Sequence, residues 1–111
     1  MVYEVHIAEQ AEGDLDAIFD YCVGHFSNKT IEQIMKGLAE TILILEVFPE
    51  GLVNFDERIG QQLFVEGSVR MFPFKSYLIF FLIREMRVAV LRVISARTDY
   101  LNQLDSLFNT Q

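Results

Sequence analysis

The sequence has few of the residues that build disulfide frameworks, metal sites and flexible linkers. Its single cysteine, Cys22, cannot form an intramolecular disulfide, so nothing indicates an oxidising compartment. One cysteine and two histidines are too few for a conventional structural zinc site. Only two prolines and six glycines accompany 51% hydrophobic residues, which excludes a disordered or collagen-like chain. We therefore expect a single domain over residues 1–111, with no metal and no cofactor.

Long hydrophobic runs and targeting signals are also missing. The longest uninterrupted apolar run, Tyr77–Ile83, is about a third of the length that a membrane-spanning helix needs. The first residues carry acids, where a signal peptide would carry bases followed by an apolar run. The sequence predicts a soluble, cytoplasmic protein that does not bind membranes.

Basic residues are scarce, and they are unevenly distributed. Nine lysines and arginines stand against sixteen acids, which gives a formal net charge of −7. Residues 1–57 hold twelve acids and two bases, whereas residues 58–111 hold four acids and seven bases. The total argues against affinity for free RNA or DNA, because such affinity comes from neutralising phosphates. Any anionic partner should contact the second half of the chain.

The first half shows one strand pattern followed by two helix patterns. Val2–Ile7 alternates between apolar and other residues, which predicts a strand. Apolar residues then recur every three or four positions from Ala8 to Phe26, and again from Ile31 to Phe48. Ser27-Asn28 can cap the second helix, and Pro49 cannot continue it. These features predict an antiparallel helical hairpin.

The second half is rich in Val, Ile, Leu and Phe and predicts strands. The expected strands are Gln62–Glu66, Val69–Phe74, Tyr77–Arg84 and Arg87–Ser95. The stretch Pro49–Gln62 is interpreted as a connection between two halves of one domain. The strand Tyr77–Arg84 should be central, because it is almost wholly apolar.

Three local features refine this expectation. Pro73 suggests that its strand lies at an edge or ends early. Glu85-Met86 is too short for anything except an antiparallel hairpin, but neither residue favours positive φ, so we expect a longer loop with frayed strand ends. Asp99 can cap a short terminal helix. The predicted fold is α+β: an N-terminal strand, a helical hairpin, a three- to four-stranded antiparallel sheet and a short C-terminal helix.

No common catalytic motif is present in the sequence. There is no glycine-rich phosphate loop, no G-x-S-x-G and no H-E-x-x-H. His6 and His25 have no orienting partner nearby in sequence, and Cys22 falls on the apolar stripe of a helix, so we interpret all three as structural or surface residues.

An acidic stripe lies opposite the apolar stripe of the first predicted helix. Its members are Glu9, Glu12, Asp16 and Asp20. We interpret it as a solvated helix face, with a basic partner segment as the next alternative and a cation site as the last.

Arginines are the most informative polar residues of the second half. Arg70, Arg84, Arg87, Arg92 and Arg97 lie on or beside predicted strands. Arginine presents a planar fork that suits phosphate or carboxylate groups. Each of these arginines could instead pair with an acidic helix or face water, but together they favour a basic patch on one side of the sheet.

Three segments together resemble the RelE/ParE superfamily of bacterial type II toxins, nearest its ParE (plasmid stabilisation) branch. The family's A-x-x-D-L-x-x-I-x-x-Y pattern is matched by Ala11, Asp14, Leu15, Ile18 and Tyr21. Its R-x-F-P…Y-x-I-F-Y stretch resembles the segment with Arg70, Phe72, Pro73, Tyr77, Ile79 and Phe80, where Phe81 takes the last position. Its last strand and the following R-x-D are matched by Arg92, Val93, Arg97 and Asp99. The resemblance covers residues 2–100 and implies the same fold.

The resemblance implies a toxin that inhibits DNA gyrase by binding and is neutralised by a ParD-like antitoxin in a hetero-oligomer. The residues expected to contact the target are Arg70, Arg97 and Tyr100. The apolar groove expected to receive the antitoxin tail is formed by Leu15, Ile18, Phe19, Phe72, Phe74 and Tyr77.

Two departures from the family pattern keep other functions open. Phe81 stands where the family often has tyrosine, and residues 96–98 replace a more basic turn. One alternative is a ribosome-dependent mRNA endoribonuclease of RelE type, with Arg70, Arg97 and Tyr100 as a reduced catalytic site. Another is a toxin-derived binding module that has lost toxicity.

Overall fold

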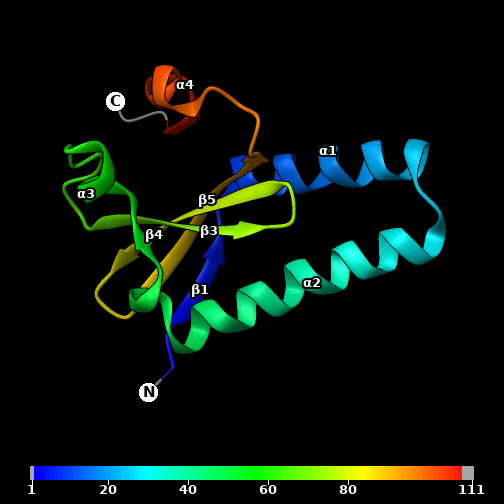
Figure 1. Cartoon of the computed structure of the whole chain (residues 1–111). Helices are drawn as coiled ribbons and strands as arrows, with labels where there is room; N and C mark the ends of the chain where they lie inside the picture. Colours follow the sequence, from blue (N-terminus) through cyan, green and yellow to red (C-terminus); the bar gives the residue numbers. More distant parts are fainter. Residues whose placement is uncertain (1, 109–111) are drawn as a thin grey trace.

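The computed structural model, which describes residues 2–108, shows an α+β fold with the predicted order of elements (Figure 1). The elements are β1 (Glu4–Ile7), α1 (Glu9–His25), α2 (Asn28–Val47), the 3-10 turn η1 (Pro49–Gly51), β2 (Val53–Asn54), α3 (Phe55–Ile59), β3 (Ser68–Phe74), β4 (Tyr77–Arg84), β5 (Arg87–Ser95), the 3-10 turn η2 (Tyr100–Asn102) and α4 (Leu104–Phe108). Within these residues, no helix is long and apolar enough to cross a membrane.

The sheet has five strands in the order β1-β5-β4-β3-β2. Strands β2, β3, β4 and β5 pair antiparallel, which confirms the predicted antiparallel sheet. β1 joins at the edge in parallel to β5, with Val5 opposite Val88 and Ile7 opposite Val90. A parallel pair needs a long connection, and here residues 8–86, with the helical hairpin and the other three strands, lie between the two paired strands.

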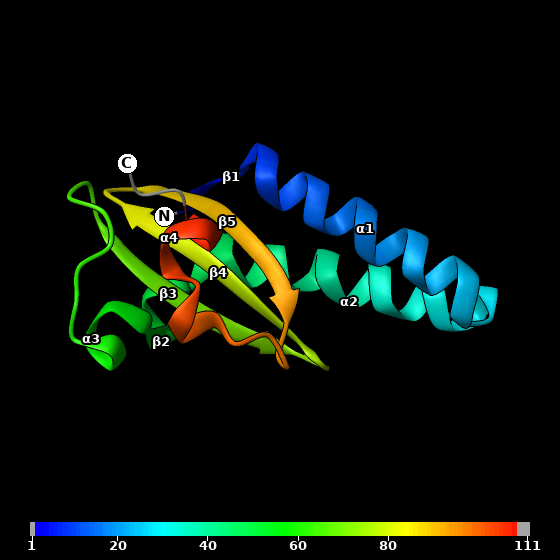
Figure 2. The ribbon, with the colours of Figure 1, turned by 90° about the horizontal axis from the view of Figure 1, so that it is seen from above.

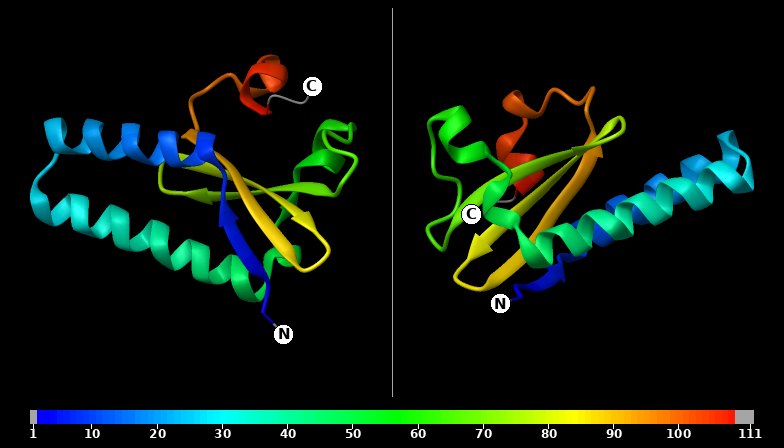
Figure 3. Two further views of the ribbon diagram at one scale, coloured as in Figure 1. Left: turned by 180° about the vertical axis from the view of Figure 1, so that it is seen from behind. Right: turned by 60° about the horizontal axis from the view of Figure 1, so that its bottom comes forward.

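Side chains on the two faces of the sheet form two separate hydrophobic clusters. Ile79 and Phe81 of β4 belong to the cluster that packs beneath α1 and α2. Leu78 and Phe80 point to the opposite face, where they pack with residues of α3, η2 and α4. Figures 2 and 3 show the hairpin on one side of the sheet and the short helices on the other. The central strand is covered on both faces, as predicted.

The helical hairpin matches its sequence prediction closely. The Ser27 hydroxyl accepts a hydrogen bond from the Thr30 amide at 3.3 Å and caps α2 as expected. α2 ends at Val47, shortly before Pro49. β1 begins at Glu4, two residues later than predicted, because the Tyr3 amide donates to the Glu46 carbonyl of α2 instead of pairing with β5.

One strand prediction for the middle of the chain was wrong. Gln62–Glu66 is not a strand; only an isolated bridge joins Phe64 to Gly67. Leu63 and Phe64 pack against the second face of the sheet, so their apolar character reflects cluster packing and not strand pairing. The stretch Pro49–Gln62 lies between the helical hairpin and β3, and it contains η1, β2 and α3.

Two turn predictions were also wrong. β4 and β5 are joined by a tight two-residue turn with Arg84 paired to Arg87, and no longer loop or frayed end is present. Glu85 adopts a positive φ of 55° in this turn, because the paired apolar strands outweigh its local preference. Asp99 precedes the 3-10 turn η2 and makes no side-chain cap to its backbone, while α4 begins only at Leu104.

Pro73 lies where its chemistry predicts. β2 pairs with β3 only at Arg70 and Met71, so the edge of β3 beyond them faces no strand. Pro73 lies on this free edge, where its missing amide hydrogen removes no ladder hydrogen bond.

Candidate functional site

A groove of about 720 Å³ lies where the helical hairpin passes the end of the sheet. Ile18 of α1 and Ile34 of α2 contribute aliphatic side chains to its wall. Tyr21, Phe26 and Tyr77 contribute aromatic side chains from the helix end and from the start of β4. The lining is therefore mainly apolar, which suits the side chains of a bound polypeptide segment.

The charged residues that line the groove are mainly basic. Lys75 lies in the tight turn between β3 and β4, and Arg97 follows the end of β5. Arg97 is exposed, and the Lys75 ammonium lies 5.8 Å from the centroid of the Phe74 ring. Asp14 is the one acidic residue of the lining, and its carboxylate is engaged by Arg92. Within residues 2–108 neither Lys75 nor Arg97 forms an ion pair, so both place positive charge beside an apolar surface.

Asp14 and Arg92 link three elements beneath the groove. The Arg92 guanidinium donates from Nε to Asp14 Oδ2 at 2.8 Å and from Nη2 to Oδ1 at 2.9 Å. Asp14 Oδ2 also accepts the Val93 amide of β5 at 2.9 Å, beyond the last residue that pairs with β1. Arg92 Nη1 donates to the Leu107 carbonyl of α4 at 3.0 Å. The hydrogen bond to Asp14 is the main reason that the pKa of Arg92 is raised.

The structure does not bring the three predicted target-contact residues together. Arg70 lies on the helix-facing side of β3, where its Nη1 donates to the carbonyls of Glu50 and Leu52. Tyr100 packs on the opposite face, in aromatic contact with Phe55 and Phe80. Arg97 alone lies at the groove. Arg70 therefore stabilises the segment after α2 by hydrogen bonds to its backbone, and Tyr100 belongs to the second hydrophobic cluster.

The predicted antitoxin-contact residues fall in different environments. Ile18 and Tyr77 line the groove. Leu15 lines a separate apolar cavity of about 180 Å³ between the hairpin and the sheet. Phe72 and Phe74 are half-buried against the first cluster, and Phe19 is exposed on α1. Two of the six residues thus share the groove.

The sequence reasoning missed several residues of the groove. Tyr21, Phe26, Lys75 and Thr98 all line it. Tyr21 and Phe26 are aromatic residues near the end of α1, and this aromatic character is the sequence signal that could have identified them. The structure leaves both exposed. Lys75 and Thr98 lie in turns, and their position depends on where the hairpin passes the sheet.

Tyr77 sits beside Cys22 at the inner wall of the groove. Burial, followed by the neighbouring Cys22 and Tyr21, raises the pKa of Tyr77. Cys22 is fully buried, as expected for an inert small side chain. The Tyr77 hydroxyl therefore stays protonated and can donate or accept a hydrogen bond within the groove.

The remaining titratable residues of α1 form no assembled site. His25 is exposed, stacks on Tyr21 at 4.0 Å between ring centroids, and its Nδ1 lies 2.8 Å from the Tyr21 carbonyl oxygen. The acidic stripe faces solvent, as predicted. Among residues 2–108, no three His, Cys, Asp or Glu side chains are grouped so that they could hold a metal ion.

Comparisons with known proteins agree with this fold. The model of the family described as the ParE toxin of the type II toxin-antitoxin system parDE matches residues 5–100. A solved structure titled the chromosomal ParDE TA system from P. aeruginosa superimposes with a TM-score of 0.64. It is 16% identical and covers 84% of this chain and 95% of that chain, so it supports the fold alone. No curated protein matches the chain significantly.

Proposed function

This chain belongs to the ParE toxin family of type II toxin–antitoxin systems, and from that premise we propose that it inhibits DNA gyrase by binding and is neutralised by a ParD-like antitoxin. Inhibition would follow from differential affinity: a protein that binds the gyrase–DNA cleavage complex more tightly than free gyrase shifts the population toward that complex. The antitoxin tail would lie in the groove between the hairpin and the sheet. We propose that residues 1–111 act as one toxin domain in this complex.

The placement of Arg70, Arg97 and Tyr100 supports binding over RNA cleavage. General acid–base catalysis needs its groups within about 3 Å of the protons they transfer. Arg70 is engaged by backbone carbonyls on one face of the sheet, whereas Tyr100 packs on the other face. This separation favours the gyrase proposal over the endoribonuclease alternative.

The chemistry of the groove supports an acidic, amphipathic tail as its occupant. Apolar side chains of such a tail would cover Ile18 and Tyr77, and its carboxylates would meet Lys75 and Arg97 at the mouth. A tail that orders on binding can cover a long groove with few specific contacts.

The observation that carries the proposal is that Arg97 lines this groove. Arg97 is a candidate for target contact, and an antitoxin tail in the groove would cover its guanidinium. Neutralisation would then follow from occlusion, because one arginine cannot serve two partners at once.

The test uses purified gyrase and the folded chain. We expect the chain to increase the fraction of DNA held in cleavage complexes, and a ParD-like antitoxin to abolish that increase. Folded protein that traps no cleavage complex would refute the gyrase proposal. Codon-phased cuts in translated messages would instead support the endoribonuclease, and harmless expression without antitoxin would support the non-toxic module.

A further inference from the structure

Apart from Glu46, the last turns of α2 carry large apolar residues on their outward side as well as on their inward side. Residues 41–48 read TILILEVF, and the inward positions Thr41 and Leu45 are buried against the first cluster. The outward residues have large exposed fractions: Leu43 58%, Ile44 42%, Val47 69% and Phe48 65%. A helix that is hydrophobic all round is normally covered all round. Here one side of the helix is covered and the other is open.

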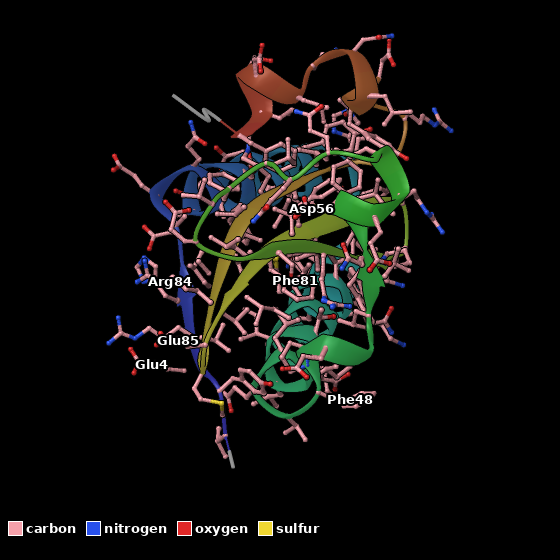
Figure 4. All side chains as sticks on the ribbon, turned by 90° about the vertical axis from the view of Figure 1, so that its left-hand side faces the viewer. Glu4, Phe48, Asp56, Phe81, Arg84 and Glu85 are labelled. Carbon is pink, nitrogen blue, oxygen red and sulfur yellow. The ribbon has the colours of Figure 1, made fainter. Side chains whose placement is uncertain are left out.

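The four outward residues, called here the α2 patch, form one continuous surface. Leu43 and Val47 are four residues apart, as are Ile44 and Phe48, so each pair is adjacent on the helix surface. Figure 4 shows Phe48 at the outer side of the molecule, beside the end of α2. The Phe48 ring lies against Gly51, where an added Cβ would come within 1.9 Å of a ring carbon. The glycine at position 51 therefore leaves room for the ring at this place.

The α2 patch lies among negatively charged residues. Residues 39–51 contain three acids, Glu40, Glu46 and Glu50, and no base, and Glu40 and Glu50 are exposed at the two ends of the patch. The nearest bases do not cancel this charge at the patch. Lys36 lies one helical turn before Glu40, and the half-buried Arg70 guanidinium is engaged by backbone carbonyls.

We propose that the α2 patch docks an amphipathic helical segment of another protein, with an apolar stripe flanked by lysines or arginines. Apolar burial would supply the affinity, and the acidic surroundings would select the basic flanks. Nucleic acids and anionic membranes are repelled by the same acids. A second copy of this chain would bring identical acids together around the patch. The patch shares no residue with the groove, so the two surfaces can be tested separately.

The experiment measures binding of two synthetic helical peptides to the full chain by fluorescence anisotropy. One peptide carries a leucine stripe with lysine flanks, and the other carries the same stripe with glutamate flanks. We expect the lysine peptide to bind, and the glutamate peptide to bind at least tenfold more weakly. The double variant Leu43→Ser/Val47→Ser should weaken the lysine peptide at least tenfold, and Glu40→Gln should weaken it two- to fivefold.

The matched control is Val23→Ser, which removes an apolar side chain that is 56% exposed on α1 outside the patch. This variant should bind the lysine peptide like the unaltered chain. Equal binding by the double variant and the control would overturn the proposal, as would a lack of binding by the lysine peptide. A dimer of the free chain that dissociates in the double variant would also overturn it, by identifying a second copy as the occupant. Glu40→Gln keeps every apolar side chain, so it tests the charge argument without altering the packing.

Discussion

Two glycines differ in whether the structure requires them. A Cβ on Gly67 would lie 1.9 Å from the Ile83 carbonyl oxygen, so the loop after α3 can approach β4 only without a side chain. Gly13 lies in the interior of α1, with no atom within 4 Å of its would-be Cβ. Gly67 is therefore required by a close backbone approach, whereas Gly13 only weakens its helix.

Alanine at these two positions should change stability in opposite directions. We expect Gly67→Ala to lower the free energy of unfolding by about 1–3 kcal/mol, because the backbone must move to relieve the overlap. We expect Gly13→Ala to raise it by about 0.5–1 kcal/mol through better helix propensity. Urea unfolding followed by circular dichroism measures both. Equal effects of the two substitutions would contradict the close approach.

Tyr77 gives a pH dependence at the alkaline end. Its folded-state pKa is raised above the usual 10.0 mainly by burial, so the folded protein holds the phenol proton more tightly than the unfolded chain does. The stability contributed by this proton is fully present below pH 10.0 and is lost as the pH rises through the folded-state pKa. We expect Tyr77→Phe to lose less stability than the unaltered chain between neutral pH and that range. Parallel unfolding curves of the two proteins at all pH values would contradict this prediction.

At the scale of elements, Asp14 and Arg92 hold α1, β5 and α4 together. Asp14→Ala should leave Nε and Nη2 of Arg92 and the Val93 amide without their acceptor. We expect a loss of about 2–3 kcal/mol, below the 3–5 kcal/mol typical of fully buried pairs, because both side chains retain some exposure. Hydrogen exchange should accelerate at the Val93 amide and in α4.

A double-mutant cycle separates the pair from its surroundings. If Asp14 and Arg92 act mainly on each other, the double substitution to alanine should cost clearly less than the sum of the single losses. Additive losses would show that each residue stabilises its own element independently. The unchanged β3–β4 hairpin serves as the internal reference for hydrogen exchange.

The sequence pattern predicted the long elements well, because each buries one periodic face. α1, α2 and the three long strands lie where their apolar spacing placed them. The pattern failed where tertiary contacts override local chemistry. Glu85 accepts a positive φ because the strands on both sides are paired up to Arg84 and Arg87. Leu63 and Phe64 are apolar because they cover the second face of the sheet. Packing of this kind leaves no periodic pattern of apolar residues in the sequence, so it cannot be predicted from spacing.

The candidate site was only partly predictable for the same reason. Ile18, Tyr77 and Arg97 were expected in functional surfaces, and all three line the groove. Leu15 carries an equally apolar signal, yet it lies in the separate cavity. Which side chains face the groove depends on how the hairpin crosses the sheet, and that crossing is set by the packing of the whole first cluster.

At the scale of the whole molecule, the uneven charge separates two surfaces. The acidic first half carries the α2 patch, whereas Lys75 and Arg97 of the basic second half lie at the groove. Because like-charged partners are repelled, each surface should select its own class of partner. The net charge of −7 describes the whole chain and does not show this division between an acidic and a basic half.

A charge reversal at Arg97 tests whether one surface serves both target and antitoxin. We expect Arg97→Glu to lose the trapping of gyrase cleavage complexes and to weaken antitoxin binding at least tenfold, with the largest difference at low salt. The matched control is Arg84→Glu, which changes another exposed arginine, at the β4–β5 turn, that is absent from the groove lining. This control changes the net charge by the same amount as Arg97→Glu. It should nevertheless keep both activities if occlusion of Arg97 explains neutralisation. Loss of both activities in the control as well would show that net charge, and not the groove, governs them. If Arg97→Glu lost only one activity, the target and the antitoxin would contact different surfaces, and occlusion would be wrong.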